Sequence, residues 1–328
     1  MGSRLRNALD KLSEKVLEYG IVLKPENIYY LTGFFPTTKA ALLLKEEPLL
    51  LVSKMDQRFA ETSTVEFKAV EKFEVEFNLK CSKIGVEKKF VSIEFYEKHL
   101  KGKEVHDLGF IEEMRKHKEK GEIKKMKRAA RITEEVMKSV AGELVGKEER
   151  EIASLAEFKI KEKAELAFNA IVAAEENSAI PHYTPGDKKI NAGEVVIIDM
   201  GAQAEHYNAD VTRTLCLGNE PEFYPIVLEA QRVAIKECYA GNEMKNADLA
   251  AREVLREYGC EEYFLHSTGH GIGLEVHEPP RLYKEATGRF EEGMVITVEP
   301  GIYKDYGIRI EDMVLVGKKA KLLTKLEK

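Results

Sequence analysis

The chain has 328 residues, of which 44% are hydrophobic and 33% are charged, and its formal net charge is −6. This length and hydrophobic content indicate a globular protein with a large core, expected to form two domains. The net negative charge does not indicate a basic surface of the kind that binds nucleic acid. No apolar run approaches the roughly 20 residues that a membrane span requires.

The four cysteines are far apart and none has CxxC spacing. They therefore indicate reduced thiols rather than a zinc site or a disulfide framework. Charged residues interrupt the N-terminus where a signal peptide would be apolar. Together these features predict a cytoplasmic protein.

Residues 1–112 alternate short segments of helical and strand character. Residues 5–18 predict a helix, and the apolar runs AALLLK and PLLLVS predict two strands. VEFKAVEKFEVEF (65–77) alternates apolar and polar residues, which is typical of a strand, and IGVEKKFVSIEFYEKHL indicates a strand followed by a helix. We therefore expect an α/β domain over residues 1–112.

Helical spacing appears from residue 113 onward. Apolar residues recur every three or four positions from Ile123 to Leu144, and Gly146 is the expected helix stop. A second helix is predicted at 152–160, and a later pair at about 221–240 and 246–258.

A β-rich segment follows each predicted pair of helices. INAGEVVIID (190–199) matches FEEGMVITVE (290–299) at an offset of 100, with glycine, strand-forming residues and a carboxylate in the same places. The fold expected for 113–328 is thus α/β (α+β), with two halves that each contain two helices and a hairpin. Two copies of modest identity leave chance similarity open.

The first predicted hairpin places carboxylates inside apolar strands. With a turn centred between residues 204 and 205, Asp199 falls opposite Asp210, and cross-strand partners lie about 5 Å apart. Two adjacent buried carboxylates are costly unless a cation compensates them or one is protonated. The alternative is that these acids face solvent.

The second predicted hairpin repeats the pattern. A turn centred on residue 305 places Glu299 opposite Glu311, and Arg309 lies two residues away on the same face as Glu311. Four carboxylates at matching points of two hairpins favour two divalent ions that share ligands, and oxygen-rich donors with one nitrogen suit Mn, Co, Fe or Zn. Such a pair activates water and polarises a carbonyl, so hydrolysis is the expected chemistry.

Three histidines lie within HSTGHGIGLEVHEPP (266–280). His270 stands between two glycines, which let backbones approach closely, so it is the predicted metal ligand. His277 follows a strand-like LEV. A single histidine is more often a core or surface residue than a ligand, and GHGIG matches neither a dinucleotide loop nor HExxH.

The chain resembles the pita-bread metallopeptidases, a family that includes aminopeptidase P and prolidase. The similarity is carried by the motifs IIDMG, NADVTRT, GHGIGLEVHE, TVEPG and RIED, and KPENIYYLTGF resembles the creatinase-type N-terminal domain. The resemblance implies a creatinase-like domain over residues 1–112 and a pita-bread catalytic domain with pseudo-twofold halves over residues 113–328.

The resemblance also implies roles for individual residues. Asp199 would be a terminal ligand of one metal, Asp210 and Glu311 would bridge, and His270 and Glu299 would be terminal ligands of the other. Glu299 would also shuttle a proton to the leaving nitrogen. The remaining family positions are the substrate-contacting His182 and His277, the pocket residue His266, and Arg309 as the partner that orients Glu311.

The resemblance further implies cleavage between an N-terminal residue and proline. Arg281 in HEPPR could hold the carboxylate of a proline-terminated dipeptide, which favours Xaa-Pro dipeptides over longer Xaa-Pro-Yaa peptides, although a surface arginine is the alternative. Aminopeptidase P activity therefore stays open, as does a pita-bread module that binds without catalysis or acts on amidino compounds. A homodimer would fit the resemblance.

Overall fold

The computed structural model describes residues 2–77 and 79–328. The chain divides into two compact units, Met1–Arg115 and Lys116–Lys328. Within the described residues, no helix is long and apolar enough to cross a membrane.

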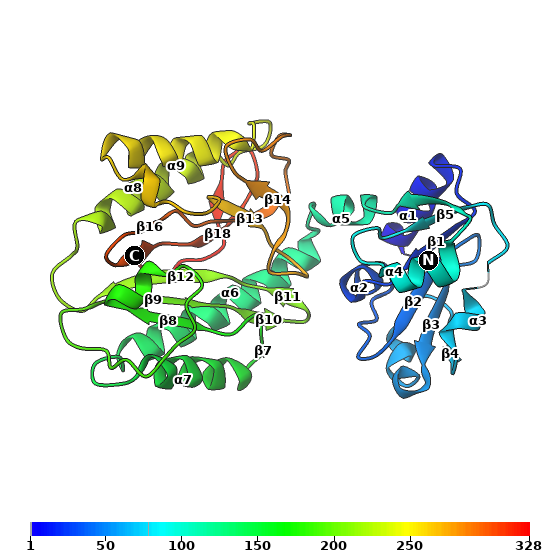
Figure 1. Ribbon diagram of the computed structural model, residues 1–328, viewed down its shortest axis with the longest axis horizontal. Coiled ribbons are helices and arrows are strands. Elements are labelled where there is room, and N and C mark those ends of the chain that lie inside the picture. The colour runs from blue at the N-terminus through cyan, green and yellow to red at the C-terminus, as the bar shows by residue number, and fades with distance from the viewer. Residues whose placement is uncertain (1, 78) are drawn as a thin grey trace. The chain divides into compact units, whose positions relative to one another are not determined.

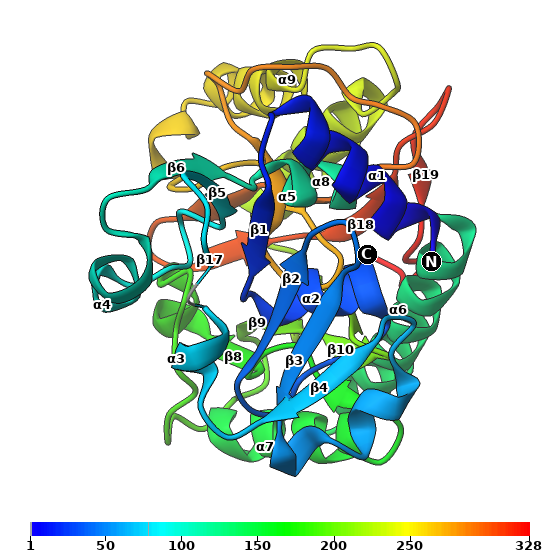
Figure 2. The ribbon, with the colours of Figure 1, turned by 90° about the vertical axis from the view of Figure 1, so that its right-hand side faces the viewer.

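A six-stranded mixed sheet in the order β4-β3-β2-β1-β5-β6 forms the first unit (Figure 2). Its strands are β1 (Tyr19–Val22), β2 (Ala40–Leu44), β3 (Leu49–Ser53), β4 (Phe67–Val70), β5 (Lys83–Val86) and β6 (Glu104–Asp107). Its main helices are α1 (Ser3–Glu14), α2 (Pro25–Thr32), α3 (Phe73–Glu76), α4 (Ile93–Phe95) and α5 (Phe110–Arg115). The two apolar runs predicted as strands are β2 and β3, and every residue of β2 is buried.

One strand prediction in this unit is wrong. Only the first part of 65–77 is a strand, β4, and the chain then forms the short helix α3. Phe73 and Phe77 are both buried, with ring centroids 6.3 Å apart. Residues four apart lie on the same face of a helix. A helical turn therefore buries both phenylalanines together, and this burial favours helix over strand despite the alternating sequence.

The second unit contains two sets of helices and strands, and Figure 1 shows α6 and α7 on one side of its strands and α8 and α9 on the other. The first set comprises α6 (Lys120–Ala141), α7 (Glu149–Lys161), β7 (Glu165–Leu166), β8 (Ile171–Ala174), β9 (Val195–Met200), β10 (Ala202–Ala204), β11 (Tyr207–Asn208) and β12 (Val211–Cys216). The second comprises α8 (Phe223–Glu237), α9 (Lys245–Glu257), β13 (Gly269–Gly271), β14 (Glu278–Leu282), β15 (Val295–Val298), β16 (Gly301–Tyr303), β17 (Gly307–Arg309), β18 (Asp312–Leu315) and β19 (Lys321–Leu322).

Each set packs its helices on its own sheet. The apolar faces of α6 and α7 form a core with the sheet β12-β9-β8, and those of α8 and α9 form a second core with the sheet β14-β13-β15-β18-β19. The strands β9 and β15 begin 100 residues apart, at Val195 and Val295, and each follows a glycine with positive φ, Gly193 at 95° and Gly293 at 93°. The matching decapeptides therefore have matching backbone conformations.

The predicted end of the first long helix is also wrong. Helix α6 begins with a capping box between Glu119 and Glu122, but it ends at Ala141 with Gly142 as its C-cap. Gly142 has low helix propensity. Leu144 is buried, but it lies in the turn that follows the helix and not in the helix itself. Gly146 adopts φ of 84° within that turn.

Candidate functional site

The first hairpin presents Asp199 and Asp210 on one face, in a register that differs from the predicted one. Asp199 pairs with Thr212 rather than with Asp210, because the turn lies one residue later, at Glu205 and His206, which both have positive φ. Asp210 is two residues from Thr212, and residues two apart in a strand share a face. The two carboxylates are therefore diagonal neighbours, so the correction leaves them on a common face.

The second hairpin has the predicted register. Val298 pairs with Asp312 in β15 and β18, and Gly301 pairs with Arg309 in β16 and β17, so Glu299 and Glu311 occupy opposed positions between these pairs. Glu311 is only 2% exposed, and the side chain of Glu299 is 16% exposed.

These acids meet His270 in one cluster. Ligand atoms of Asp199, Asp210 and Glu311 all lie within 4.8 Å of one another, and so do those of His270, Glu299 and Glu311. Nε2 of His270 is 3.2 Å from Oε1 of Glu299 and 3.8 Å from Oδ2 of Asp210. The structure thus brings together all five residues predicted as metal ligands.

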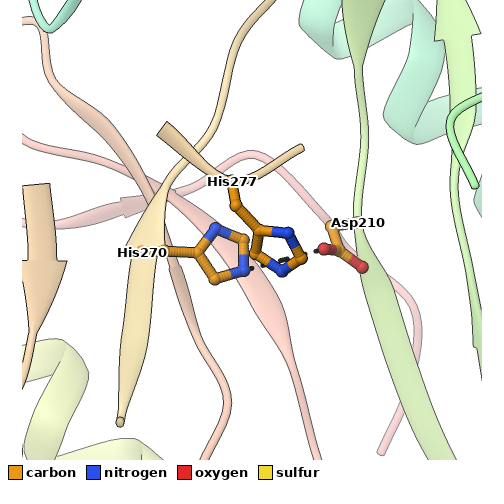
Figure 3. Close-up of side chains that lie close together, drawn as sticks. All are labelled: Asp210, His270 and His277. Carbon is orange, nitrogen blue, oxygen red and sulfur yellow. Dashed lines mark ion pairs between the residues drawn. The ribbon is translucent and has the colours of Figure 1, made fainter. Parts of the chain in front are cut away.

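His277 stands next to this cluster, and in Figure 3 its ring lies in front of the line that joins His270 to the Asp210 carboxylate. The ring centroids of His270 and His277 are 4.3 Å apart, and Asp210, His270 and His277 also form a group close enough to share an ion. The preceding LEV segment is a bend and not the expected strand. The sequence therefore did not indicate that His277 would lie within ligand distance.

The protonation pattern of the cluster reflects the crowding of its buried carboxylates. Burial and the charges of the neighbouring carboxylates raise the pKa of Glu311 to about 8 and that of Asp210 well above its usual range. Burial alone would raise the pKa of Glu299 and lower that of His270, but their mutual hydrogen bond and opposite charges bring the pKa of Glu299 to about 2 and that of His270 to about 9. Four carboxylates cannot all ionise here without further cations.

Three carboxylate oxygens of the cluster have no protein partner. Across residues 2–77 and 79–328, Oδ1 of Asp199, Oδ1 of Asp210 and Oε1 of Glu311 are buried without a hydrogen bond. Buried polar atoms without partners are rare and point to an unseen ion or water. The donor set therefore fits divalent cations.

The glycines beside His270 provide room for close backbone packing, as predicted. A Cβ at Gly269 would lie 2.0 Å from the carbonyl oxygen of Thr297, and one at Gly271 would lie 2.2 Å from that of Pro279. Nδ1 of His270 is 3.0 Å from the carbonyl oxygen of Gly271. If Nδ1 carries the proton and donates it there, Nε2 is left as the ligand atom on the side of the carboxylates.

Hydrogen bonds fix the orientation of the carboxylates. Thr212 Oγ1 donates to Glu311 Oε2 at 2.8 Å, and Arg309 Nη2 donates to Asp199 Oδ2 at 2.7 Å. The predicted orienting partner of Glu311, Arg309, therefore binds Asp199 directly and reaches Glu311 only through Thr212, to whose Oγ1 its Nε donates at 3.2 Å. The long side chain of Arg309 reaches across to β9, and the shorter Thr212 holds Glu311.

Tyr303 links two of the predicted residues and was missed in the sequence. Its hydroxyl accepts from Arg309 Nη1 at 2.9 Å and lies 2.8 Å from Nε2 of His266. Burial, which outweighs the opposing effect of Arg309, raises the pKa of Tyr303 to about 12, and the charges of Glu299 and Asp199 act in the same direction as burial. The only local signal was an aromatic residue four positions after Glu299.

A cavity of about 850 Å³ opens onto the cluster. Its wall includes His182, His266, His277 and Arg281 as well as the apolar residues Phe168, Ile171 and Val276. Arg281 is exposed and is the cross-strand partner of His270. All residues predicted to contact substrate therefore line one pocket.

Arg309→Met is expected to lower the free energy of unfolding of the metal-free protein by about 3–5 kcal/mol, because it leaves the buried Asp199 carboxylate without its ion-pair partner. Urea unfolding at pH 7 measures the change. Arg309→Lys keeps the charge without the planar fork of donors, so its loss should be intermediate. Arg281→Met makes the same chemical change at the exposed arginine of the pocket, and an equal loss there would contradict the argument.

Two family models match the chain. The model of the Creatinase/Prolidase N-terminal domain matches residues 4–117, and that of metallopeptidase family M24 matches residues 124–318. The second match alone covers more than half of the chain.

Relatives are similar over the full length. An Xaa-Pro dipeptidase from Pyrococcus furiosus is 36% identical, with 100% of this chain and 99% of the relative covered. The crystal structure of a prolidase from Pyrococcus horikoshii OT3 superposes with a TM-score of 0.96 at 34% identity, covering 100% of this chain and 99% of that one. An X-Pro aminopeptidase from Thermotoga maritima MSB8 has a TM-score of 0.89 at 34% identity, with 98% of both chains covered.

Proposed function

The chain belongs to metallopeptidase family M24, and on that premise we propose that it is a prolidase, a metal-dependent hydrolase that cleaves Xaa-Pro dipeptides. In this proposal residues 1–112 are the creatinase-like domain and residues 113–328 are the pita-bread catalytic domain. The full-length similarity to an Xaa-Pro dipeptidase and to a prolidase structure supports the substrate class.

The observation that carries the proposal is the buried cluster of four carboxylates and one imidazole with three unpartnered oxygens. We assign the cluster two divalent ions, with Mn, Co, Fe and Zn as candidates. Asp199 would hold one ion, Asp210 and Glu311 would bridge, and His270 and Glu299 would hold the other. When bound, such ions lower the pKa of a water toward about 7 and polarise the substrate carbonyl.

The protein groups around the cluster account for the remaining steps. Glu299 accepts the proton of the attacking water and delivers it to the proline nitrogen, which must be protonated to leave because an amine anion is a poor leaving group. His182 and His277 contact the substrate and donate hydrogen bonds to the developing oxyanion. His266 and Tyr303 form the next layer of the pocket beside Glu299, with Nδ1 of His266 4.0 Å from Oε2 of Glu299.

Arg281 favours a dipeptide substrate. Its guanidinium lies in the wall of the same cavity as His277, and Nε donates to Ser267 Oγ at 3.2 Å. An exposed arginine of this kind can donate a two-pronged hydrogen bond to the carboxylate of a C-terminal proline. A longer peptide has no carboxylate at that point.

Xaa-Pro dipeptides are expected to be cleaved faster than Xaa-Pro-Yaa tripeptides, by about tenfold or more in kcat/KM, because only the dipeptide offers Arg281 a charged partner. Steady-state kinetics with both substrates, each in the presence of Mn, Co, Fe or Zn, measure this ratio and identify the supporting metal. Faster tripeptide cleavage would assign aminopeptidase P activity instead, which the similarity to an X-Pro aminopeptidase keeps as the second candidate.

The variant Arg281→Ala tests whether Arg281 causes the preference for dipeptides over tripeptides. It should raise KM for the dipeptide and leave kcat/KM for the tripeptide nearly unchanged. An equal loss on both substrates would mean that Arg281 does not read the proline carboxylate. Absence of cleavage of either substrate with every metal would favour a binding module.

We further propose a homodimer in the cytoplasm. The free state of Cys81, Cys216, Cys238 and Cys260 supports a reducing compartment. Sedimentation of the purified chain tests the dimer directly.

A further inference from the structure

The segment that carries His182 has little regular structure of its own. A short 3-10 helix (Glu175–Ala179) is followed by residues 180–194, which contain no helix or strand. Across the described parts of the chain, 2–77 and 79–328, the imidazole of His182 forms no hydrogen bond. The ring therefore takes its position from the backbone of this segment, and that backbone needs anchors from elsewhere in the fold.

Glu149, the first residue of α7, anchors the backbone on both sides of His182. Its side chain is fully buried. Oε1 accepts from the backbone N–H of Ala174 at 2.8 Å, and Oε2 accepts from that of Gly186 at 3.2 Å. Nδ2 of Asn177 donates to both oxygens, at 3.0 and 3.2 Å. One carboxylate thus holds residues 174 and 186, which flank His182 on either side.

Tyr183 adds a contact directly beside His182. Its hydroxyl accepts from Nδ2 of Asn177 at 2.9 Å. Burial, followed by the hydrogen bond and negative charge of Glu149, raises the pKa of Tyr183 to about 12. All groups that hydrogen-bond to the carboxylate are therefore donors, a pattern that a carboxylate satisfies and a carboxamide does not.

The middle of the segment is attached to the metal cluster itself. Arg309 Nη1 donates to the carbonyl oxygen of Pro181 at 3.1 Å, and Arg309 also holds Asp199. The backbone N–H of Gly307 donates to Ser178 Oγ at 2.7 Å. The residue before His182 is thus fixed to the cluster, while Glu149 fixes the backbone at residues 174 and 186.

We propose that Glu149 is a positioning residue that holds His182 at the substrate, an inference that rests on the role proposed above for His182. The carboxylate touches neither the pocket nor the cluster, so it acts only through the segment. A displacement of about 1 Å at a substrate-contacting group can lower the rate by about 100-fold.

The test is a set of full-length, metal-loaded variants: Glu149→Gln, His182→Ala and the double variant. Glu149→Gln turns an amide group toward N–H donors without changing the side-chain volume. We expect kcat on an Xaa-Pro dipeptide to fall by about 10- to 100-fold with little change in KM. In the His182→Ala background the same change should reduce kcat by less than about twofold, because the group that it positions is gone.

Glu87→Gln is the matched control. Glu87 in the first unit is also buried and also accepts from two backbone N–H groups, those of Leu23 and Lys24, and from an asparagine, Asn27. The control therefore repeats the chemical change outside the His182 segment and should keep kcat within about twofold of the parent. An equal loss in kcat from Glu87→Gln and Glu149→Gln would overturn the proposal.

Two further measurements do not depend on activity. Histidine-selective NMR, with the His182 resonance assigned by its loss in His182→Ala, should show that resonance shifted or broadened in Glu149→Gln and unchanged in Glu87→Gln. Calorimetric titration with Mn²⁺ should give the same stoichiometry and affinity in the Glu149→Gln variant and the parent.

Three further results would also overturn the proposal: full additivity of the two substitutions, an unchanged His182 resonance in Glu149→Gln, or weakened Mn²⁺ binding in that variant. If the parent chain cleaves no Xaa-Pro peptide, the proposed function fails. The NMR comparison then still decides whether Glu149 positions His182.

Discussion

Replacing Asp210 or Glu311 with alanine is expected to abolish both metal binding and hydrolysis, with kcat/KM lower by about 1,000-fold or more. Each residue is the proposed bridge between two ions, so its loss removes a ligand from both. Lewis-acid activation contributes several kcal/mol to such reactions, and each 1.36 kcal/mol is a factor of ten in rate. Calorimetric titration with Mn²⁺ and dipeptide kinetics measure the two losses separately.

The control for these variants is Asp305→Ala, in the exposed turn of the second hairpin. It removes a carboxylate of the same hairpin without touching the cluster, so it should bind metal and cleave substrate as the parent does. Asp210→Ala and Glu311→Ala should also fold, because removing one acid from a crowded buried cluster relieves repulsion between carboxylates. Activity surviving in both variants would rule out the dinuclear arrangement.

Removing divalent ions with a chelator is expected to lower the melting temperature of the protein, and by more at pH 8 than at pH 5. In the metal-free fold the pKa of Glu311 is about 8, against an ordinary value of 4.5, so its protonated form dominates at low pH. A carboxyl with a raised folded-state pKa stabilises the fold below 4.5, and this contribution is lost as the pH rises toward 8.

His270 changes stability in the same direction over part of this range. Its folded pKa of about 9 exceeds its ordinary value of 6.5, so its contribution is present below 6.5 and is lost as the pH rises through 9. The lowered pKa of Glu299, about 2, adds stability that disappears only in strong acid, outside this window. The melting temperature of the chelated protein should therefore decline from pH 5 to pH 8.

Loading the chelated protein with Mn²⁺ should remove most of that decline and release protons, because the ions bind only deprotonated ligands. At pH 6.5 we expect about two or more protons per chain, measured by calorimetry in buffers that differ in ionisation enthalpy. Glu311→Ala serves as the comparison and should release fewer. A pH-independent melting temperature in the chelated protein would contradict the assigned charge state.

The carboxylate positions could be predicted from the sequence, because strand periodicity and the offset of 100 between the matching decapeptides fix which side chains share a face. His270 was predicted from its flanking glycines, and the other site histidines from the resemblance to the pita-bread metallopeptidases. The prediction that these carboxylates share a face also holds for some errors in the strand register. A register that is wrong by two residues in the first hairpin still leaves Asp199 and Asp210 on one side, whereas an error of one residue would have separated them.

The partners of the charged side chains could not be read in the same way. Arg309 was predicted beside Glu311 because the two are neighbours in one strand, yet its guanidinium reaches Asp199 on another strand. Tyr303 and Glu149 gave no pattern at all, since their roles depend on groups that are remote in sequence, such as His266 and Ala174.

The sequence by itself determined the helix pairs, the two hairpins and the four acids that meet at their centre, because local periodicity dictates which residues turn inward. The glycines on either side of His270 indicated the one imidazole that joins them. Only the tertiary structure decided how these groups are held. The hydrogen-bond partners of four side chains depend on distance and desolvation: Arg309, Thr212, Tyr303 and Glu149. Those distances and that burial exist only once the separate strands and helices have packed together.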